Sequence, residues 1–253
     1  MTILHLDSGR DWRGGQVQMR RLIEGLEARS VTCAVQSPLM TRRADKHDLI
    51  HCHDARTHTF ALVSPMARRP FVVSRRVGFP IGRSWLSRWK YSRAAKYLAV
   101  SRFVADRLIE ANVPASKIEI VYDGVPNMPR ADRSSGRVLA LSKSGVGVPG
   151  AIPIADLERD LSACGVLIYW SEMEGLGSAA LLAQAAGVPV VARRVGGLPE
   201  AVKFGVLVDR LDEIPAAVER ARKIEVDVEA IEREFGVDRM VDLTLGVYRE
   251  ALA

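Results

Sequence analysis

The sequence has few of the features that mark secreted, membrane-spanning or disordered proteins. It contains three cysteines in 253 residues (Cys33, Cys52 and Cys164), which lie far apart and are odd in number. This pattern is neither a disulfide framework nor a metal-ligand motif. Aromatic residues make up only 6% of the chain, whereas apolar residues make up 48% and charged residues 26%. Those fractions are typical of a folded globular protein, and we expect a reducing, cytoplasmic location.

Long apolar runs are also missing. The longest stretch without a charged residue extends from Gly175 to Ala192, and three glycines, Gln184 and Pro189 interrupt it. It predicts a buried helix followed by a strand rather than a membrane span. The first residues, Met1-Thr-Ile-Leu-His-Leu, enter a strand-like run directly, without the pattern of a signal peptide. We therefore expect neither secretion nor insertion into a membrane.

Acidic residues are absent from one long segment. Residues 55–105 contain no aspartate or glutamate but eleven arginines and lysines, and the whole chain has a net charge of +6. Within this segment, Arg83, Arg88 and Lys90 are interleaved with Trp85 and Trp89. Basic and aromatic side chains together suit an anionic membrane surface, and they also suit nucleic acid. The alternative is a solvated helix whose rings pack inward. The length of the acid-free segment favours an anionic partner, and we assign these five residues to an acceptor or membrane contact.

Short apolar runs alternate with helical patterns over most of the chain. In the first half, strands are expected at residues 3–6, 31–35, 49–51, 71–73, 97–100 and 118–121. In the second half, strands are expected at residues 138–141, 166–169, 188–192 and 206–208, and a helix is expected at 154–163. Repeated strand–helix units predict two parallel sheets with helices on both faces. The fold class is therefore α/β, with two Rossmann-like, doubly wound domains.

A polar, turn-rich stretch at residues 127–135 predicts the linker between the two domains. We expect the first domain at residues 1–126 and a shorter second domain at 127–253. The last helix, at about residues 237–252, is expected to cross back and pack on the first domain. Open α/β sheets bind ligands at the carboxyl ends of their strands. Functional residues are therefore expected where strands end.

Two patterns in the first half lie at such positions. Gly14 and Gly15 precede a helix, where backbone amides can approach an anion, although a tight turn is the simpler reading of two glycines alone. His51 and His53 flank Cys52 on an expected strand. A zinc site needs further ligands that the sequence does not offer, and we expect no metal. His53 at the strand end can donate a hydrogen bond to a substrate oxygen, and a structural histidine is the alternative.

One segment of the second half is the most informative. Glu174 is expected in the loop after a strand, and Gly175, Leu176 and Gly177 open the following helix. A carboxylate beside a glycine-rich helix start can accept hydrogen bonds from sugar hydroxyls while backbone amides hold phosphate. A second glycine turn, Gly196-Gly197, ends the next strand on the same edge of the sheet. Ordinary turns explain either loop alone, but two such loops on one edge predict a ligand site.

Together these motifs resemble those of the family 4 glycosyltransferases (glycosyl transferases group 1), which have the two-domain GT-B fold. The matching segments are Glu174-Gly-Leu-Gly, Ala186-Gly-Val-Pro-Val-Val-Ala, Val195-Gly-Gly-Leu-Pro-Glu, Gly14-Gly15 and Asp48-Leu-Ile-His-Cys-His-Asp-Ala-Arg. The resemblance implies transfer of a sugar, with retention and without a metal or other cofactor, from a UDP- or GDP-linked donor. It implies an envelope glycan or lipid-linked acceptor, as in lipopolysaccharide biosynthesis, at the inner face of the cytoplasmic membrane. Nucleic acid is not expected as a partner.

The resemblance also implies roles for individual residues. Gly14 and Gly15 match the loop that faces the donor phosphates, and His53 matches the histidine near the reaction centre. Glu174 matches the first glutamate of the E-x7-E motif, which contacts the donor sugar. Gly175, Leu176 and Gly177 match the helix start near the diphosphate. Lys143 is the candidate for the cation that clamps the diphosphate.

Two features depart from the family pattern. The second glutamate of E-x7-E is replaced by Leu182, which cannot accept hydrogen bonds from ribose, so donor binding is expected to be weaker by about tenfold or more. The second domain is also short between Val121 and Leu157. These departures support an alternative, a degenerate relative that acts as a binding or scaffold protein without catalysis. A third hypothesis is an RNA- or membrane-binding module built on the basic segment.

Overall fold

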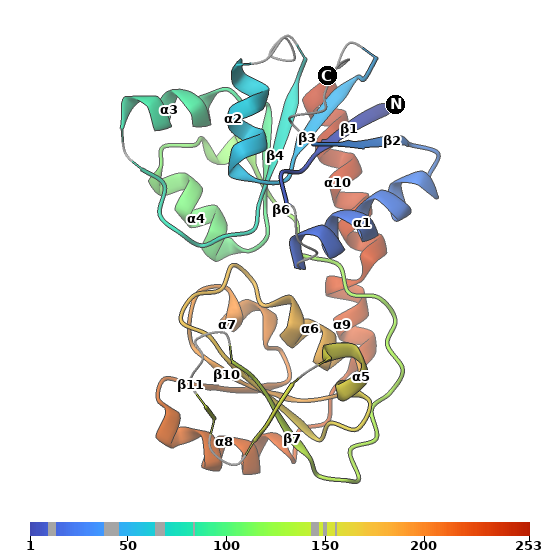
Figure 1. Ribbon diagram of the computed structural model, residues 1–253, viewed down its shortest axis with the longest axis vertical. Coiled ribbons are helices and arrows are strands. Elements are labelled where there is room, and N and C mark those ends of the chain that lie inside the picture. Colours follow the sequence, from blue (N-terminus) through green and yellow to red (C-terminus); the bar gives the residue numbers. More distant parts are fainter. Residues whose placement is uncertain are drawn as a thin grey trace. The chain divides into compact units, whose positions relative to one another are not determined.

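The computed structural model describes residues 1–9, 14–37, 46–63, 69–82, 84–142, 147–148, 151–154 and 156–253. The chain divides into two compact units, which Figure 1 shows coloured along the sequence. Unit 1 comprises Met1–Gly124 and Val237–Ala253, and unit 2 comprises Val125–Gly236. The chain thus leaves unit 1 once, builds unit 2 and returns to unit 1 with its last helix.

Unit 1 is built on a six-stranded parallel sheet with the strand order β2-β1-β3-β4-β5-β6. Its strands are β1 (Thr2–Leu6), β2 (Thr32–Gln36), β3 (Leu49–Cys52), β4 (Phe71–Arg75), β5 (Lys96–Ala99) and β6 (Ile118–Ile120). Its helices are α1 (Gly14–Glu27), α2 (Ala55–Val63), α3 (Trp85–Ser92), α4 (Arg102–Glu110) and α10 (Val237–Leu252), with a short 3₁₀ turn at Ala115–Lys117. The central strands β1, β3 and β4 are buried almost throughout, as parallel strands covered on both faces must be.

Helix α10 completes the core of unit 1 by packing against α1. Gly25 makes this close approach possible, because a β-carbon there would clash with the side chain of Val241. At the end of α1, Arg29 forms ion pairs of 2.8 Å with Asp238 and 2.9 Å with Asp242. The expectation that the C-terminal helix packs on the first domain is therefore confirmed.

Unit 2 is built on a five-stranded parallel sheet with the strand order β11-β10-β9-β7-β8. Its strands are β7 (Val138–Ser142), β8 (Ile152–Pro153), β9 (Val166–Trp170), β10 (Val190–Arg193) and β11 (Gly205–Val208). Its helices are α5 (Leu157–Leu161), α6 (Ser178–Ala185), α7 (Leu198–Ala201), α8 (Ile214–Ala221) and α9 (Val228–Phe235), with a 3₁₀ turn at Leu211–Glu213. Apolar clusters cover both faces of the sheet, one beneath α6 and the other beneath α8.

The predicted α/β class with two doubly wound parallel sheets is confirmed, and every expected strand occurs within about two residues of its predicted ends. The prediction is wrong at residues 154–163, where the helix is limited to Leu157–Leu161 and a short edge strand, β8, precedes it. It also misses α9. That helix begins at a capping aspartate, Asp227, whose side chain accepts a hydrogen bond from the amide of Ala230.

Candidate functional site

Three buried histidines lie at or near the carboxyl ends of β1 and β3. His5 belongs to β1 and His51 to β3, and His53 directly follows β3. Register places His5 opposite His51 on the neighbouring strand. We call His5, His51 and His53 the histidine cluster. The sequence predicted His53 at a strand end and missed His5, which sits between two leucines on β1 and gave no spacing signal.

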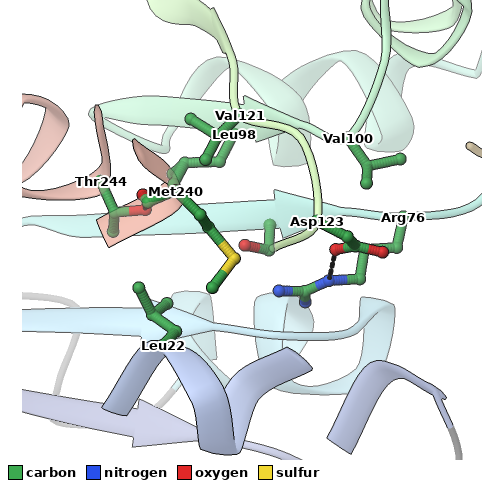
Figure 2. Close-up of a pocket in the computed structure, with 9 residues that line it drawn as sticks. Leu22, Arg76, Leu98, Val100, Val121, Asp123, Met240 and Thr244 are labelled. Atoms are coloured by element: carbon green, nitrogen blue, oxygen red, sulfur yellow. Dashed lines mark hydrogen bonds and ion pairs between the residues drawn. The ribbon is translucent and has the colours of Figure 1, made fainter. Parts of the chain in front are cut away.

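His53 has a protein partner at each ring nitrogen. Its Nε2 atom is 2.9 Å from Nδ1 of His5, and its Nδ1 atom is 3.4 Å from Nη1 of Arg76. Arg76 in turn donates from Nε to Asp123 at 3.1 Å, and Figure 2 shows this ion pair. Arg76 follows β4 and Asp123 follows β6, so the pair connects the ends of two strands. A substrate that contacts His53 must displace one of these bonds, and the bond from Arg76 is the longer.

Burial lowers the pKa of every ring in the histidine cluster. The pKa of His53 and of His51 is held well below 6.5, mainly by desolvation and further by neighbouring ring and guanidinium charge. The pKa of His5 falls to about 3, by desolvation first and by Arg76 second. All three rings are therefore neutral at physiological pH. A neutral ring can accept as well as donate a hydrogen bond.

The histidine cluster also has the composition of a metal site, since one ring nitrogen from each histidine lies within 4.8 Å of the others. However, His51 uses both nitrogens in hydrogen bonds, to Tyr248 at 2.6 Å and to Ser74 at 2.8 Å. The Arg76 guanidinium beside His53 also opposes a further cation. The arrangement favours a hydrogen-bonded cluster over metal coordination.

A small cavity lies beside the Arg76–Asp123 pair, lined by Leu22, Leu98, Met240 and Thr244 among others (Figure 2). Its volume of about 10 Å³ is close to that of one water molecule. A sugar does not fit there.

Gly14 and Gly15 form the first residues of α1. A β-carbon at either position would meet no described atom within 4 Å. Packing among the described residues therefore does not require glycine at this helix start. The open space is what close approach of a ligand to the backbone needs.

In unit 2, Glu174 lies in the loop between β9 and α6. Its carboxylate accepts a hydrogen bond of 2.8 Å from the hydroxyl group of Tyr169, near the end of β9. The Glu174 side chain is only 9% exposed. Burial, and then the nearby carboxylate, raise the pKa of Tyr169 well above its ordinary value, so the hydroxyl remains a donor. The sequence predicted Glu174 and missed Tyr169.

The two glycine-containing loops of unit 2 pack directly on one another. The amide of Gly197 donates to the carbonyl group of Glu174 at 3.1 Å. A β-carbon on Gly196 would overlap the carbonyl oxygen of Glu174, and one on Gly197 would overlap that of Gly175. Gly196 also has a positive φ of 56°. These glycines are therefore required by backbone contact, and that contact holds the two loops together at the ends of β9 and β10.

Glycine is required before α6 because of backbone conformation rather than backbone contact. Gly177 precedes the helix with φ of 100°, a left-handed conformation that glycine adopts most easily. Leu176 is buried, so its side chain contributes packing and only its backbone could reach a ligand. The helix start at Gly175 to Gly177 is therefore defined by its backbone conformation, and its backbone is the part that can contact a ligand.

Leu182, at the position of the missing glutamate, is 6% exposed and belongs to the apolar cluster beneath α6. Gln184 cannot take its place. Its amide donates to the carbonyl groups of Ala180 and Ala201 and accepts from the amides of Lys203 and Phe204. These four bonds satisfy the whole side-chain amide and tie α6 to the segment between α7 and β11.

Arg193 was not predicted from the sequence. It ends β10, and its guanidinium carbon lies 5.3 Å from the ring centre of Trp170, at the end of β9. Its neighbour Arg194 is paired with Asp209. Among the described residues, Arg193 has no carboxylate within ion-pair distance. Lys143, the predicted diphosphate cation, lies outside the described residues.

The basic and aromatic segment forms α3 and its surroundings. Trp85 is 69% exposed and Trp89 44% exposed, and Arg88 is exposed between them. Phe79 and Leu86 are also exposed and apolar. Several large apolar side chains are therefore exposed on one short segment.

Not every residue of this segment faces outward. The ammonium group of Lys90 donates to the carbonyl group of Ala55 at 2.9 Å and to Thr59 Oγ1 at 2.7 Å, so it joins α3 to α2. Tyr91 and Tyr97 pack inward. Arg83 lies outside the described residues. In the part of the chain that the structure describes, we find no helix with the length and apolar character needed to cross a bilayer.

Two known families match the chain by sequence. The family described as "Glycosyltransferase Family 4" matches residues 34–127, and the one described as "Glycosyl transferases group 1" matches residues 99–224. A D-inositol 3-phosphate glycosyltransferase from Corynebacterium efficiens is 30% identical over 184 residues, which cover 65% of this chain and 42% of the relative. The chain thus spans less than half the length of the curated relatives it matches.

Solved structures share the fold at low sequence identity. Anabaena HepE in complex with UDP and glucose superposes with a TM-score of 0.74 and 16% identity, covering 98% of this chain and 99% of that chain. Sucrose-phosphate synthase from Thermosynechococcus elongatus gives a TM-score of 0.77 and 14% identity, covering 98% of both chains.

Proposed function

The chain belongs to the glycosyltransferases of family 4 (group 1) and has the GT-B fold, and on that premise we propose that it transfers a sugar from a nucleotide donor. The single observation that carries the proposal is in unit 2. There, the loops that follow β9 and β10 are held in backbone contact, with a buried carboxylate between a tyrosine donor and a glycine-rich helix start. This arrangement suits a ligand that is both a sugar and a phosphate.

In the proposed site, Glu174 accepts hydrogen bonds from hydroxyl groups of the donor sugar. A carboxylate has two oxygens with several lone pairs, so Glu174 can accept from sugar hydroxyls as well as from the hydroxyl of Tyr169. Hydrogen bonds to a charged acceptor are stronger than those between neutral groups. The nucleotide part of the donor is UDP or GDP.

The donor diphosphate is assigned to the helix start at Gly175 to Gly177 of unit 2. Separately, the open backbone at Gly14 and Gly15 of unit 1 is proposed to accept an anionic group. Helix N-termini favour anions. Arg193 is the proposed cation, because it ends a strand on the same edge and has only the Trp170 ring as a described partner. Negative charge that develops on the departing diphosphate would be stabilised by these groups, without a metal.

We assign His53 to contact with a substrate. A hydroxyl group of the substrate would replace Arg76 at Nδ1 and donate to that nitrogen. Arg76 would keep its bond to Asp123 and remain beside the site as a fixed positive charge. In this proposal His53 orients the hydroxyl group without removing its proton, and the departing diphosphate takes up that proton.

The acceptor is proposed to be an envelope glycan or a lipid-linked molecule, as in lipopolysaccharide synthesis at the inner face of the cytoplasmic membrane. The names of the similar proteins do not single out an acceptor, since one is a D-inositol 3-phosphate glycosyltransferase and another is a sucrose-phosphate synthase. Support comes instead from the exposed Trp85, Arg88 and Trp89 on α3. Indole rings favour the interfacial region of a bilayer, and arginine favours lipid phosphate.

A scaffold function without catalysis is favoured by one observation, the burial of Leu182 where the family has a ribose-binding glutamate. The two functions differ in whether nucleotide binds at all. Release of UDP or GDP from a panel of nucleotide sugars therefore tests the proposal. Glu174→Gln should abolish release, whereas Glu172→Gln, an exposed carboxylate in the same loop, should not. Equal activity of both variants would contradict the site assignment.

The membrane contact is tested separately by sedimentation with vesicles. Binding to vesicles that contain phosphatidylglycerol should exceed binding to phosphatidylcholine alone, and it should fall in a Trp85→Ser, Trp89→Ser double variant. Ile109→Ser on α4, another exposed apolar side chain of unit 1, is the matched control. Unchanged binding by the double variant would contradict the role of α3, and preferential binding of RNA would favour a nucleic-acid surface.

A further inference from the structure

His5 is fully buried on β1 and contacts the nitrogen of His53 that faces the protein interior. Because none of its surface is exposed, His5 cannot touch a substrate. The planes of the two rings are nearly parallel, at 19°, with centroids 5.2 Å apart. Any influence of His5 on the reaction is therefore indirect, and its hydrogen bond leads to His53.

Arg76 determines which nitrogen of His53 carries the proton. A guanidinium group can donate hydrogen bonds but cannot accept them. Since Nη1 of Arg76 is bonded to Nδ1 of His53, that nitrogen is the acceptor and carries no hydrogen. The lowered pKa of His53 keeps the ring neutral, with a single N–H. The proton must then be on Nε2.

The Nε2–H group of His53 points at His5. Nδ1 of His5, 2.9 Å away, is the acceptor, so the proton of the neutral His5 ring is on its own Nε2. That Nε2 atom is buried and has no hydrogen-bond partner among the described residues. An unpaired buried N–H is destabilising. A buried apolar side chain at this position would avoid that cost. The presence of histidine therefore indicates a role for its acceptor nitrogen, Nδ1.

We propose that His5 is a positioning residue, whose Nδ1 accepts the Nε2–H of His53 and so fixes the ring orientation of His53 for contact with substrate through Nδ1. The role of His53 in substrate contact rests on the proposed function. The hydrogen-bonded pair of His5 and His53 does not depend on it. Donation from Nε2 also makes the opposite nitrogen a better acceptor, as in histidines that are oriented by a second partner. Arg76 sets the tautomer, and His5 holds the ring.

His51 provides a control of the same kind and burial. It lies beside His53, with ring centroids 4.0 Å apart, but its nitrogens bond Tyr248 and Ser74. No bond joins a nitrogen of His51 to a nitrogen of His53 in the described structure. Substitution of His51 therefore disturbs the same core without removing the acceptor of His53.

Nuclear magnetic resonance of the full chain labelled with ¹⁵N-histidine tests the pair without any substrate. We expect the Nε2–H tautomer for His53 and a scalar coupling across the hydrogen bond between its Nε2 and Nδ1 of His5. His5→Asn, which offers an amide oxygen near the position of Nδ1, should retain a slowly exchanging Nε2–H on His53. His5→Leu should lose it, and His51→Asn should keep it. An Nδ1–H tautomer of His53 in the unmodified protein would overturn the proposal.

The second readout is the rate of nucleotide release from the donor. We expect His5→Leu to lower kcat by about tenfold or more with KM for the donor unchanged, and His5→Asn to recover most of the loss. Equal losses in both variants would contradict a positioning role, and if His5→Leu does not fold, the tautomer and the His5→Asn result decide. Absence of release from the unmodified protein would contradict the proposed function instead, and the coupling would still decide the pair.

Discussion

The hydroxyl group of Tyr169 donates a hydrogen bond of 2.8 Å to the carboxylate of Glu174. The two residues are five positions apart and belong to the end of β9 and the loop that follows it. The tyrosine ring is part of the apolar cluster beneath α6, so its hydroxyl position is fixed by packing. The carboxylate is therefore oriented before a ligand arrives, which reduces the entropy lost on binding.

Removal of this hydroxyl should weaken binding of the donor sugar specifically. Tyr169→Phe is expected to lower the affinity for a nucleotide sugar by about tenfold, because a hydrogen bond to a charged group contributes roughly 1.5–3 kcal/mol. The affinity for the nucleotide diphosphate alone should not change. Titration calorimetry with both ligands measures the difference. Tyr97→Phe, which removes a buried tyrosine hydroxyl in unit 1, is the control. Equal losses for sugar nucleotide and diphosphate would contradict the role of Glu174.

The two glycine loops should respond differently to an added methyl group. Gly177→Ala forces a side chain into a left-handed conformation and against Leu198, and should lower the free energy of unfolding by about 1–3 kcal/mol. Gly15→Ala meets open space within α1 and should leave the free energy of unfolding unchanged or raise it by up to about 1 kcal/mol. Denaturant unfolding monitored by circular dichroism measures both variants. A loss of stability in Gly15→Ala, or none in Gly177→Ala, would contradict the packing described for that loop.

Arg193 should contribute to phosphate affinity more than its neighbour does. Arg193→Met keeps a long side chain over Trp170 and removes the charge, and should weaken binding of UDP or GDP by about tenfold while nucleoside binding is unaffected. Arg194→Met, which removes the partner of Asp209, should have little effect. Trp170 fluorescence offers a second signal, since its ring contacts the guanidinium. If the two variants behave alike, Arg193 is not the diphosphate cation.

Stability of unit 1 should fall in acid because of its buried neutral histidines. Burial lowers the pKa of His58 to about 3 from 6.5, so the unfolded chain binds a proton between these pH values that the folded chain does not. Stability is therefore complete above pH 6.5 and decreases as the pH falls toward 3, by up to about 1.4 kcal/mol per pH unit for each such histidine.

His58→Phe should reduce this dependence by about one proton, because it removes a titrating group and leaves a ring among Phe71, Tyr91 and Tyr97. Denaturant unfolding at a series of pH values between 4 and 7 measures the slope, and constant m-values would show that the exposed surface is unchanged. A slope that is identical in the unmodified protein and the variant would contradict a buried neutral His58.

The sequence was sufficient to place the strands and the residues that end them. Glu174 and His53 follow buried apolar runs, and the strand ends are where α/β sheets collect functional groups. The basic and aromatic pattern singled out Trp85 and Trp89, and both side chains are exposed in the structure. The pattern does not identify what they bind, so their role stays a prediction.

Pairings between distant residues left no trace in the sequence. Arg76 and Asp123 are 47 positions apart, and His51 and Tyr248 are 197 apart, so only the folded topology brings them together. Lys90 illustrates the same point, since a lysine expected to face an anionic partner bonds the neighbouring helix instead. The glycines at 196 and 197 suggested one loop of a ligand site. In the structure, glycine is required at both positions by contact with the backbone of Glu174 and Gly175.

Titration of the unmodified chain with UDP, GDP and a matching nucleotide sugar tests the central claim most directly. The account predicts saturable binding of one diphosphate, tighter binding of the corresponding sugar nucleotide, and loss of that difference in Glu174→Gln but not in Glu172→Gln. Absence of binding for every nucleotide at millimolar concentration would contradict a donor site in unit 2 and favour the scaffold function.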